Sequence, residues 1–302
     1  MSYSLYFHLK PAVLHEDMFY YFVGRAHYAA NGDAFVYENP DTEAFFQVRF
    51  RSGRNFRLKK TVVSVEFEIN YFRPSYFAIE AEKELSAFVA KFQPQIEDPQ
   101  MHGMDEGPYS GEKFISAWNF GNVFTTHNAI KREPEKKIAS MPSELLRASW
   151  SWNYQLPARR RDFDCRCNVP KIHLVWMKDR ICRGIIWPCA APIVLPHVDY
   201  VALADTTLAM PRFALASWSE VIDVIQGAGF DTKRDPIQLE YSVIPTAIKD
   251  WFADKNPTDP DLPPSLDAYR IVDEEVIAAA RASGEENGAL SLQRPAVQGL
   301  GW

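Results

Sequence analysis

The sequence predicts an α+β protein with antiparallel-rich sheets, helices packed on one face of those sheets, and two similar-sized lobes. The length of 302 residues suits about two domains, and a hydrophobic content of 47% with 14% aromatic residues is enough to fill their cores. The first elements follow in the order strand, helix, three strands, helix, strand. This order is typical of helices that cover one face of a mainly antiparallel sheet.

Residues 1–100 are expected to form one α+β sandwich unit. Alternation of apolar and polar side chains indicates strands, because successive residues of a strand point to opposite faces. Apolar residues at three- and four-residue spacing indicate helices. The expected elements are a strand at 2–9, a helix at 15–29, strands at 34–38, 43–50 and 61–70, a helix at 77–92 and a strand at 95–97.

The segment 61–70 has the clearest strand pattern in the chain. The side chains expected to be buried along it are Val63, Val65, Phe67 and Ile69. Glu66 and Glu68 alternate with them and are expected to face solvent. A slip of one residue would exchange the two faces, so burial along this strand tests the predicted register.

The rest of the chain is divided by composition. A glycine- and proline-rich stretch at 98–111 marks the end of the first unit and the start of a helical connector, 101–160. A second α+β lobe, 161–302, follows and ends in a mobile acidic tail. The expected helices are 112–130, 143–154, 217–227, 245–252 and 273–282, and the expected strands are 171–177, 181–187, 193–195 and 198–204.

Charge and composition limit the function classes. The net charge of −6 argues against nucleic acid and anionic membranes as partners, and residues 231–302 alone carry 13 acidic and 7 basic side chains. No apolar run reaches the roughly 18 residues of a membrane span, and no signal peptide is evident. Four cysteines in such a chain fit a reducing, cytoplasmic location.

No cofactor and no metal site are expected. The four cysteines lie within 25 residues, but the spacing of Cys165, Cys167, Cys182 and Cys189 fits no common zinc site. A nucleophile with its base could be assembled from Cys189, His197 and Asp199, yet no local signature surrounds them. Phosphate-binding glycine motifs are absent from the sequence. An enzyme with a dispersed site remains an alternative, with His102, Asp105 and Glu106 in a glycine-rich loop as its best candidates.

Partner binding is the other function class. The segment 70–77 places Tyr71, Arg73 and Tyr76 around a proline, and tyrosine and arginine are the residues that dominate protein-binding hot spots. Alternatively, this loop packs over the end of the sheet. The face with Glu66 and Glu68 directly precedes it.

Three segments carry a resemblance to a protein class: residues 37–42, 67–77 and 118–122. They resemble uncharacterised bacterial proteins that are similar in character to the cytoplasmic immunity proteins encoded beside interbacterial toxins, such as those of type VI secretion. The resemblance implies an inhibitor without catalytic residues that neutralises a toxin domain. Because the protein is acidic, charge complementarity leads us to expect that this domain is basic. The expected partner-binding residues are Glu66, Glu68, Tyr71, Arg73, Tyr76, Asp254, Asp259 and Asp261. A structural or assembly protein is the third alternative.

Overall fold

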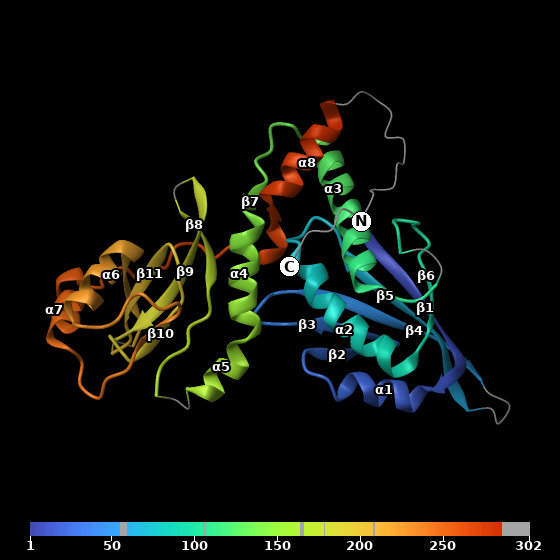
Figure 1. Cartoon of the computed structure of the whole chain (residues 1–302), viewed down its shortest axis with the longest axis horizontal. Helices are drawn as coiled ribbons and strands as arrows, with labels where there is room; N and C mark the ends of the chain where they lie inside the picture. The colour runs from blue at the N-terminus through green and yellow to red at the C-terminus, as the bar shows by residue number, and fades with distance from the viewer. Residues whose placement is uncertain (55–58, 105–106, 164–165, 178, 208, 286–302) are drawn as a thin grey trace. The chain divides into compact units, whose positions relative to one another are not determined.

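The fold belongs to the α+β class that the sequence predicts. The computed structural model describes residues 1–285 apart from 55–58, 105–106, 164–165, 178 and 208 (Figure 1). Within this part, eight α-helices accompany sheets in which most strand pairs are antiparallel. The chain forms two compact units. Unit 1 comprises Met1–Ser143 and the chain from Tyr269 onward, and unit 2 comprises Glu144–Ala268.

Unit 1 is built on one six-stranded sheet. Its elements are β1 (Ser2–Leu14), α1 (His15–Val23), β2 (Tyr28–Asn31), β3 (Ala34–Glu38), β4 (Phe45–Arg54), β5 (Lys60–Asn70), α2 (Tyr76–Phe92), β6 (Gln95–Glu97), α3 (Gly111–Arg132), β7 (Ala139–Met141), β14 (Ile271–Asp273) and α8 (Glu274–Glu285). The sheet has the order β2-β3-β4-β5-β1-β6. A short 3-10 helix, η1 (Ala268–Arg270), leads from unit 2 into β14.

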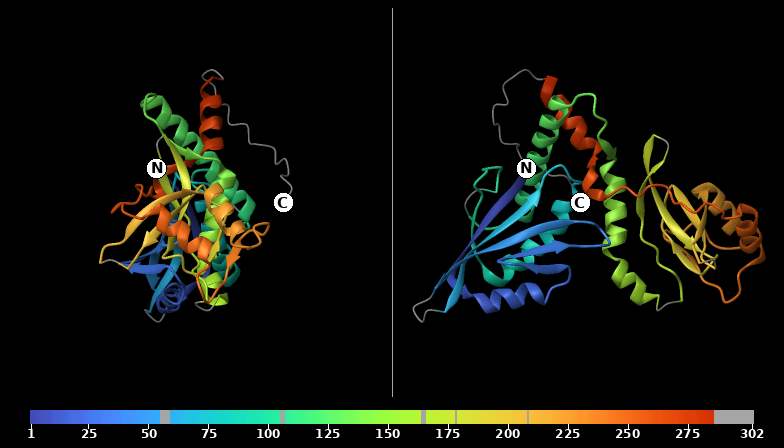
Figure 2. Two further views of the ribbon diagram at one scale, coloured as in Figure 1. Left: turned by 90° about the vertical axis from the view of Figure 1, so that its left-hand side faces the viewer. Right: turned by 180° about the vertical axis from the view of Figure 1, so that it is seen from behind.

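Three helices cover one face of this sheet. The ring of Phe88 on α2 lies 5.4 Å from that of Phe7 on β1, and the ring of Phe114 on α3 lies 5.8 Å from that of Phe67 on β5. Phe22 on α1 is 6.0 Å from Phe88, so the helices also contact one another through aromatic rings. The other face of the sheet, seen from behind, carries no helix of the described part of the chain (Figure 2, right). The one-sided helix layer therefore matches the prediction.

The predicted register of β5 is correct over most of the strand but wrong at Val63. Val65, Phe67 and Ile69 are buried, and Glu66 and Glu68 are partly exposed. Val63 is 39% exposed, whereas its neighbour Val62 is fully buried. Ser64 pairs with Arg51 and Val62 with Ser52 on β4, which leaves Val63 as an extra residue. This β-bulge reverses the alternation below Ser64, and alternation alone cannot reveal such an insertion.

Five strands of the described residues were not predicted from the sequence: β2, β7, β12 (Arg212–Ser217), β13 (Ile237–Leu239) and β14. β2 pairs with β3, and the Asn31-Gly32 turn between them has φ +62° at Gly32. The helix predicted at 15–29 would end just before this dipeptide, but asparagine-glycine is also the preferred turn of a two-stranded hairpin. The helix ends earlier, at Val23. Of the others, β12 pairs with β11 (Tyr200–Asp205) in unit 2, and β14 pairs with β7 in unit 1.

The two units do not follow the expected division at residues 100 and 160. Helix α3 packs against α8 within unit 1, although the expectation assigned one to a connector and the other to a second lobe. β14 pairs in parallel with β7, and the buried carboxylate of Asp273 accepts hydrogen bonds from the backbone N (2.7 Å) and Oγ (2.9 Å) of Ser75. The C-terminal segment thus caps the start of α2. Of the tail expected to be mobile, beyond Ser283, residues 284 and 285 belong to the end of α8, and residues 286–302 lie outside the described residues.

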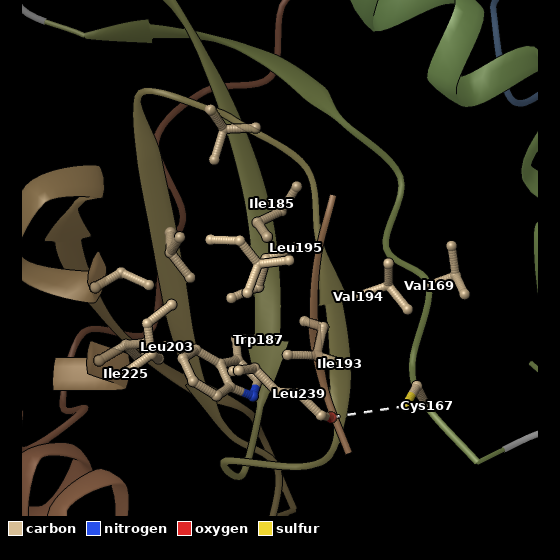
Figure 3. Packing of buried hydrophobic residues seen from close by; sticks show 14 of the residues in the cluster. Cys167, Val169, Ile185, Trp187, Ile193, Val194, Leu195, Leu203, Ile225 and Leu239 are labelled. Carbon is tan, nitrogen blue, oxygen red and sulfur yellow. Dashed lines mark hydrogen bonds between the residues drawn. The ribbon is translucent and has the colours of Figure 1, made fainter. Parts of the chain in front are cut away.

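Unit 2 has its own hydrophobic core. Its elements are α4 (Ser143–Tyr154), which begins at the last residue of unit 1, α5 (Leu156–Asp162), β8 (His173–Met177), β9 (Arg180–Pro188), β10 (Ile193–Leu195), β11 (Tyr200–Asp205), β12 (Arg212–Ser217), α6 (Trp218–Gly227), β13 (Ile237–Leu239) and α7 (Thr246–Lys255). The sheet order is β12-β11-β9-β8, with β10 and β13 as a separate pair. Trp187, fully buried, lies among the aliphatic side chains of this core (Figure 3).

Candidate functional site

The loop 70–77 packs into the interior of unit 1. Tyr71 is 5% exposed and Tyr76 4% exposed. The hydroxyl of Tyr76 donates to the carbonyl of Thr42 at 3.1 Å, and the hydroxyl of Tyr71 is hydrogen-bonded to Nδ1 of His102 at 3.0 Å. Burial raises the pKa of both phenols well above the ordinary value. The expectation that Tyr71 and Tyr76 present contact area to a partner is therefore wrong for this conformation, and the packing alternative describes the loop.

Helix α3 holds this loop in a fixed conformation. Oδ1 of Asn122 accepts from the backbone N of Phe72 at 2.6 Å, and its Nδ2 donates to the carbonyl of Arg73 at 2.9 Å. Phe72 has φ +61°, an unusual backbone conformation for a residue with a side chain. Gly121 lies directly against the Tyr71 ring. Two of the segments that carry the resemblance, 67–77 and 118–122, are thus the two halves of one packing contact.

The third such segment, 37–42, surrounds a buried carboxylate. Oε1 of Glu80, on α2 and 1% exposed, accepts hydrogen bonds from three side chains: Tyr37 (2.7 Å), Asn39 (2.7 Å) and Thr42 (3.0 Å). These bonds fasten the β3–β4 connection to α2. All three segments of the resemblance therefore have a structural role in unit 1.

Arg73 differs from Tyr71 and Tyr76, the other two predicted residues of the loop, because it remains partly exposed. Its guanidinium carbon lies 5.6 Å from the centre of the Phe45 ring and 5.9 Å from that of Tyr269, distances typical of cation–π contacts. Nη1 donates to the carbonyl of Phe72 at 2.8 Å, while Nε is buried without a hydrogen-bond partner. Burial lowers the pKa of Arg73, with Tyr269 acting in the opposite direction. Of the predicted loop residues, Arg73 is the one that can reach a partner.

Glu66 and Glu68 lie on the helix-free face of the sheet and interact with the neighbouring strands. Glu66 accepts from the hydroxyl of Tyr6 at 3.3 Å. Glu68 accepts from Oγ of Ser2 at 2.7 Å and from the side-chain amide of Gln47. Such cross-strand pairs are ordinary for a solvated sheet face, so these carboxylates are accessible but already hydrogen-bonded.

The three predicted partner-binding aspartates, Asp254, Asp259 and Asp261, lie in unit 2 and are exposed. Asp254 is near the end of α7. Asp259 forms a two-way backbone bridge with Phe213 on β12, at 2.8 and 3.1 Å, and its side chain accepts from the backbone N of Asp261 at 2.9 Å. The eight predicted partner-binding residues are thus divided between two units, five in unit 1 and three in unit 2.

His102, the one residue of the enzyme alternative that the structure describes, is engaged in packing. The ring of His102 stacks on that of Tyr3, with the ring centres 5.9 Å apart. Burial lowers the pKa of His102, although the nearby Asp98 carboxylate acts to raise it. Asp98 accepts from the hydroxyl of Tyr3 at 2.9 Å and from the backbone N of His102 at 3.1 Å. Asp105 and Glu106 lie outside the described residues.

The Cys189–His197–Asp199 arrangement is not assembled in unit 2. Sγ of Cys189 contacts Oγ1 of Thr206 at 3.0 Å. His197 and Asp199 both contact Arg183 instead, through Nη2 (3.3 Å) and the backbone N (2.7 Å) respectively. In the part of the chain described, no three His, Cys, Asp or Glu side chains gather as metal ligands would. Cys165 lies outside that part.

A surface on α1 was missed by the sequence reading. Phe19, Tyr20 and Val23 are 36%, 69% and 50% exposed, and together they form what we call the aromatic face of α1. Glu16 and Asp17, in the first turn of the same helix, are also exposed. A signal for this surface was present, because the six residues 18–23 are all apolar or aromatic. A helix on a sheet buries only one stripe, so some of them have to face solvent.

Comparisons of the chain with family models, with curated proteins and with solved structures found no match. Across the described residues, no helix combines the length and the apolar character needed to cross a bilayer.

Proposed function

We propose that this protein is a cytoplasmic immunity protein that binds and neutralises a cognate toxin domain. The observation that carries the proposal is the aromatic face of α1. Three large apolar side chains gathered on one nine-residue helix leave apolar area in water, and such patches mark interaction surfaces more often than singly scattered residues do. The resemblance of segments 37–42, 67–77 and 118–122 to immunity proteins supports the kind of partner.

The aromatic face is anchored in the core of unit 1. The ring of Phe19 lies 5.4 Å from that of Phe35, which is almost fully buried on β3, and 5.9 Å from that of Tyr20. Met18 and Phe22, on the opposite side of the helix, are buried. A partner would therefore meet side chains that are already ordered, which reduces the entropy lost on binding.

Charge on the same helix favours a basic partner. Glu16 and Asp17 stabilise the helix N-terminus through the helix dipole, and both remain exposed. Placed beside Tyr20, they would form an acidic rim around an aromatic anchor. Such a rim increases the association rate with a positively charged surface more than it increases affinity. Free Cys167, Cys182 and Cys189 are compatible with a reducing compartment.

The test is co-expression with the product of the adjacent gene. Wild-type protein should protect cells from that product. A Tyr20→Ala/Val23→Ser variant should protect poorly, because loss of a hot-spot anchor costs ~2 kcal/mol, or about 30-fold in Kd. Kd would be measured by titration calorimetry with an inactive form of the toxin.

The matched control is Val243→Ser in unit 2, where Val243 is 80% exposed and belongs to no proposed site. Circular dichroism and the urea midpoint would establish that both variants are folded, as expected for exposed positions. The proposal is contradicted if the adjacent gene product is not toxic, or if the Tyr20→Ala/Val23→Ser variant protects as well as Val243→Ser does.

A further inference from the structure

Another arginine of unit 1, Arg25, contacts both an aromatic ring and a carboxylate, whereas Arg73, among the described residues, contacts aromatic rings but no carboxylate. The guanidinium carbon of Arg25 lies 5.3 Å from the centre of the Tyr21 ring. Both Nε and Nη2 of Arg25 contact Oε2 of Glu84 at 2.8 Å. Burial acts to lower the pKa of Arg25, but the Glu84 carboxylate outweighs burial, and the pKa is raised. Here an aromatic ring and a carboxylate together stabilise a half-buried cation.

Arg73 has the aromatic contacts but not the carboxylate. Within the described residues no acidic side chain contacts it, and its pKa is lowered because no anion offsets burial. Asp273 approaches the same loop, but its two oxygens accept from Ser75. A partly buried charge without a counter-ion is costly, so the site is one that an external anion would stabilise.

The hydrogen-bonding capacity of Arg73 that remains free is at its outer end. Nε is buried, and one hydrogen of Nη1 is used by the carbonyl of Phe72. Nη2 has no protein partner among the described residues and is not one of the buried unpaired atoms. The two terminal nitrogens can therefore donate side by side to the two oxygens of a carboxylate, the geometry that guanidinium groups favour.

We propose that Arg73, in contact with the rings of Phe45 and Tyr269, is a binding site for the carboxylate of an acidic side chain on a protein partner. A single guanidinium matches a monoanion, whereas a phosphate group usually gathers several donors. The rings of Phe45 and Tyr269 would exclude water around the pair. The proposal does not depend on the partner being a toxin.

The test uses the wild-type protein, labelled with nitrogen-15 in its arginine side chains. The Nε–Hε NMR signals of Arg73 and Arg25 would be assigned through Arg73→Lys and Arg25→Lys, or by through-bond correlation if a variant does not fold. The protein is titrated with acetyl-Gly-Glu-Gly-amide, with the neutral acetyl-Gly-Gln-Gly-amide, and with inorganic phosphate, all at one ionic strength.

The expected result is a saturable shift of the Arg73 signal with the glutamate peptide, at a concentration at least tenfold lower than with the glutamine peptide. The Arg25 signal should not move, because Glu84 already occupies that arginine. No saturable shift at Arg73, or equal shifts with both peptides, would overturn the proposal. The guanidinium carbon of Arg270 lies 5.6 Å from the centre of the same Tyr269 ring. Because a phosphate group usually gathers several donors, this second guanidinium makes phosphate the competing ligand. Tighter binding of phosphate than of the glutamate peptide would also overturn it.

Discussion

Gly121 on α3 is the position where a single added methyl group tests the packing of the loop 70–77. A Cβ at this position would lie 2.3 Å from both Cζ and the hydroxyl oxygen of Tyr71, and 2.5 Å from Cε1. Ordinary van der Waals contact begins near 3.4 Å, so the ring would have to move by about 1 Å. The ring is buried and its hydroxyl is hydrogen-bonded to His102, so it has little room to do so.

The magnitude for Gly121→Ala follows from three contributions. Overpacking of a core costs about 1–3 kcal/mol. Separation of the Tyr71 hydroxyl from His102 would add about 1–3 kcal/mol if the hydroxyl remains buried. The higher helix propensity of alanine returns about 1 kcal/mol. The free energy of unfolding should therefore fall by about 1–5 kcal/mol, which with a urea slope of about 2 kcal/mol per molar lowers the midpoint by about 0.5–2.5 M.

The assay is urea unfolding monitored by pulse-labelling hydrogen exchange and mass spectrometry. This method reports the unfolding of peptides from α3 and from α6 separately. The control is Gly227→Ala at the end of α6, where a Cβ meets no atom within 4 Å, so stability should be unchanged or slightly higher. In a Tyr71→Leu background, Gly121→Ala should cost less than in the wild type. A change below about 0.5 kcal/mol, or an equal cost in both backgrounds, would refute the reasoning.

Two further predictions concern carboxylates that the fold uses structurally. Glu80→Ala removes the acceptor that Tyr37, Asn39 and Thr42 share. At about 1–3 kcal/mol for each of these hydrogen bonds, the free energy of unfolding in urea should fall by at least about 3 kcal/mol. A fall as small as that caused by Glu16→Ala, at an exposed position, would contradict this prediction. At Glu220, the hydrogen bond from Lys255 and those from Ser217 lower the pKa from about 4.5 to about 2. The ionised Glu220 side chain therefore adds its full contribution to the free energy of unfolding above pH 4.5, and this contribution is lost as the pH falls toward 2. Wild-type protein and Glu220→Gln should therefore converge in stability across that window, and a constant difference between them would count against this pairing.

Local patterns were sufficient for much of the fold, and the exceptions share a cause. The strands at 34–38, 95–97 and 193–195 and the helix at 143–154 have the predicted bounds because periodicity and capping are local properties. Val63 and the pairing of β14 with β7 were missed because both depend on a partner strand. A bulge is defined by the residues opposite it, and no pattern within β5 records them.

The candidate site was harder to predict because composition does not specify exposure. Tyrosine next to arginine and proline is typical of binding loops and equally of a loop that covers the end of a sheet. Asn122 and His102, about 30 to 50 residues away in sequence, decide between the two by bonding to the loop. The aromatic run 18–23 was locally visible, but which of its residues face solvent depends on the orientation of α1 on the sheet.

The buried and exposed residues of the loop 70–77 belong to one arrangement. Tyr71 and Tyr76 fix the two ends of the loop in the core, while Asn122 holds the backbone on both sides of Arg73. The guanidinium is therefore positioned before any ligand arrives, and the ordering cost of a long, flexible side chain is met during folding. An arginine presented this way can contribute more to affinity than one on a mobile loop, because little entropy remains to be lost. The buried tyrosines would then influence partner binding through the position of Arg73 and not through contact.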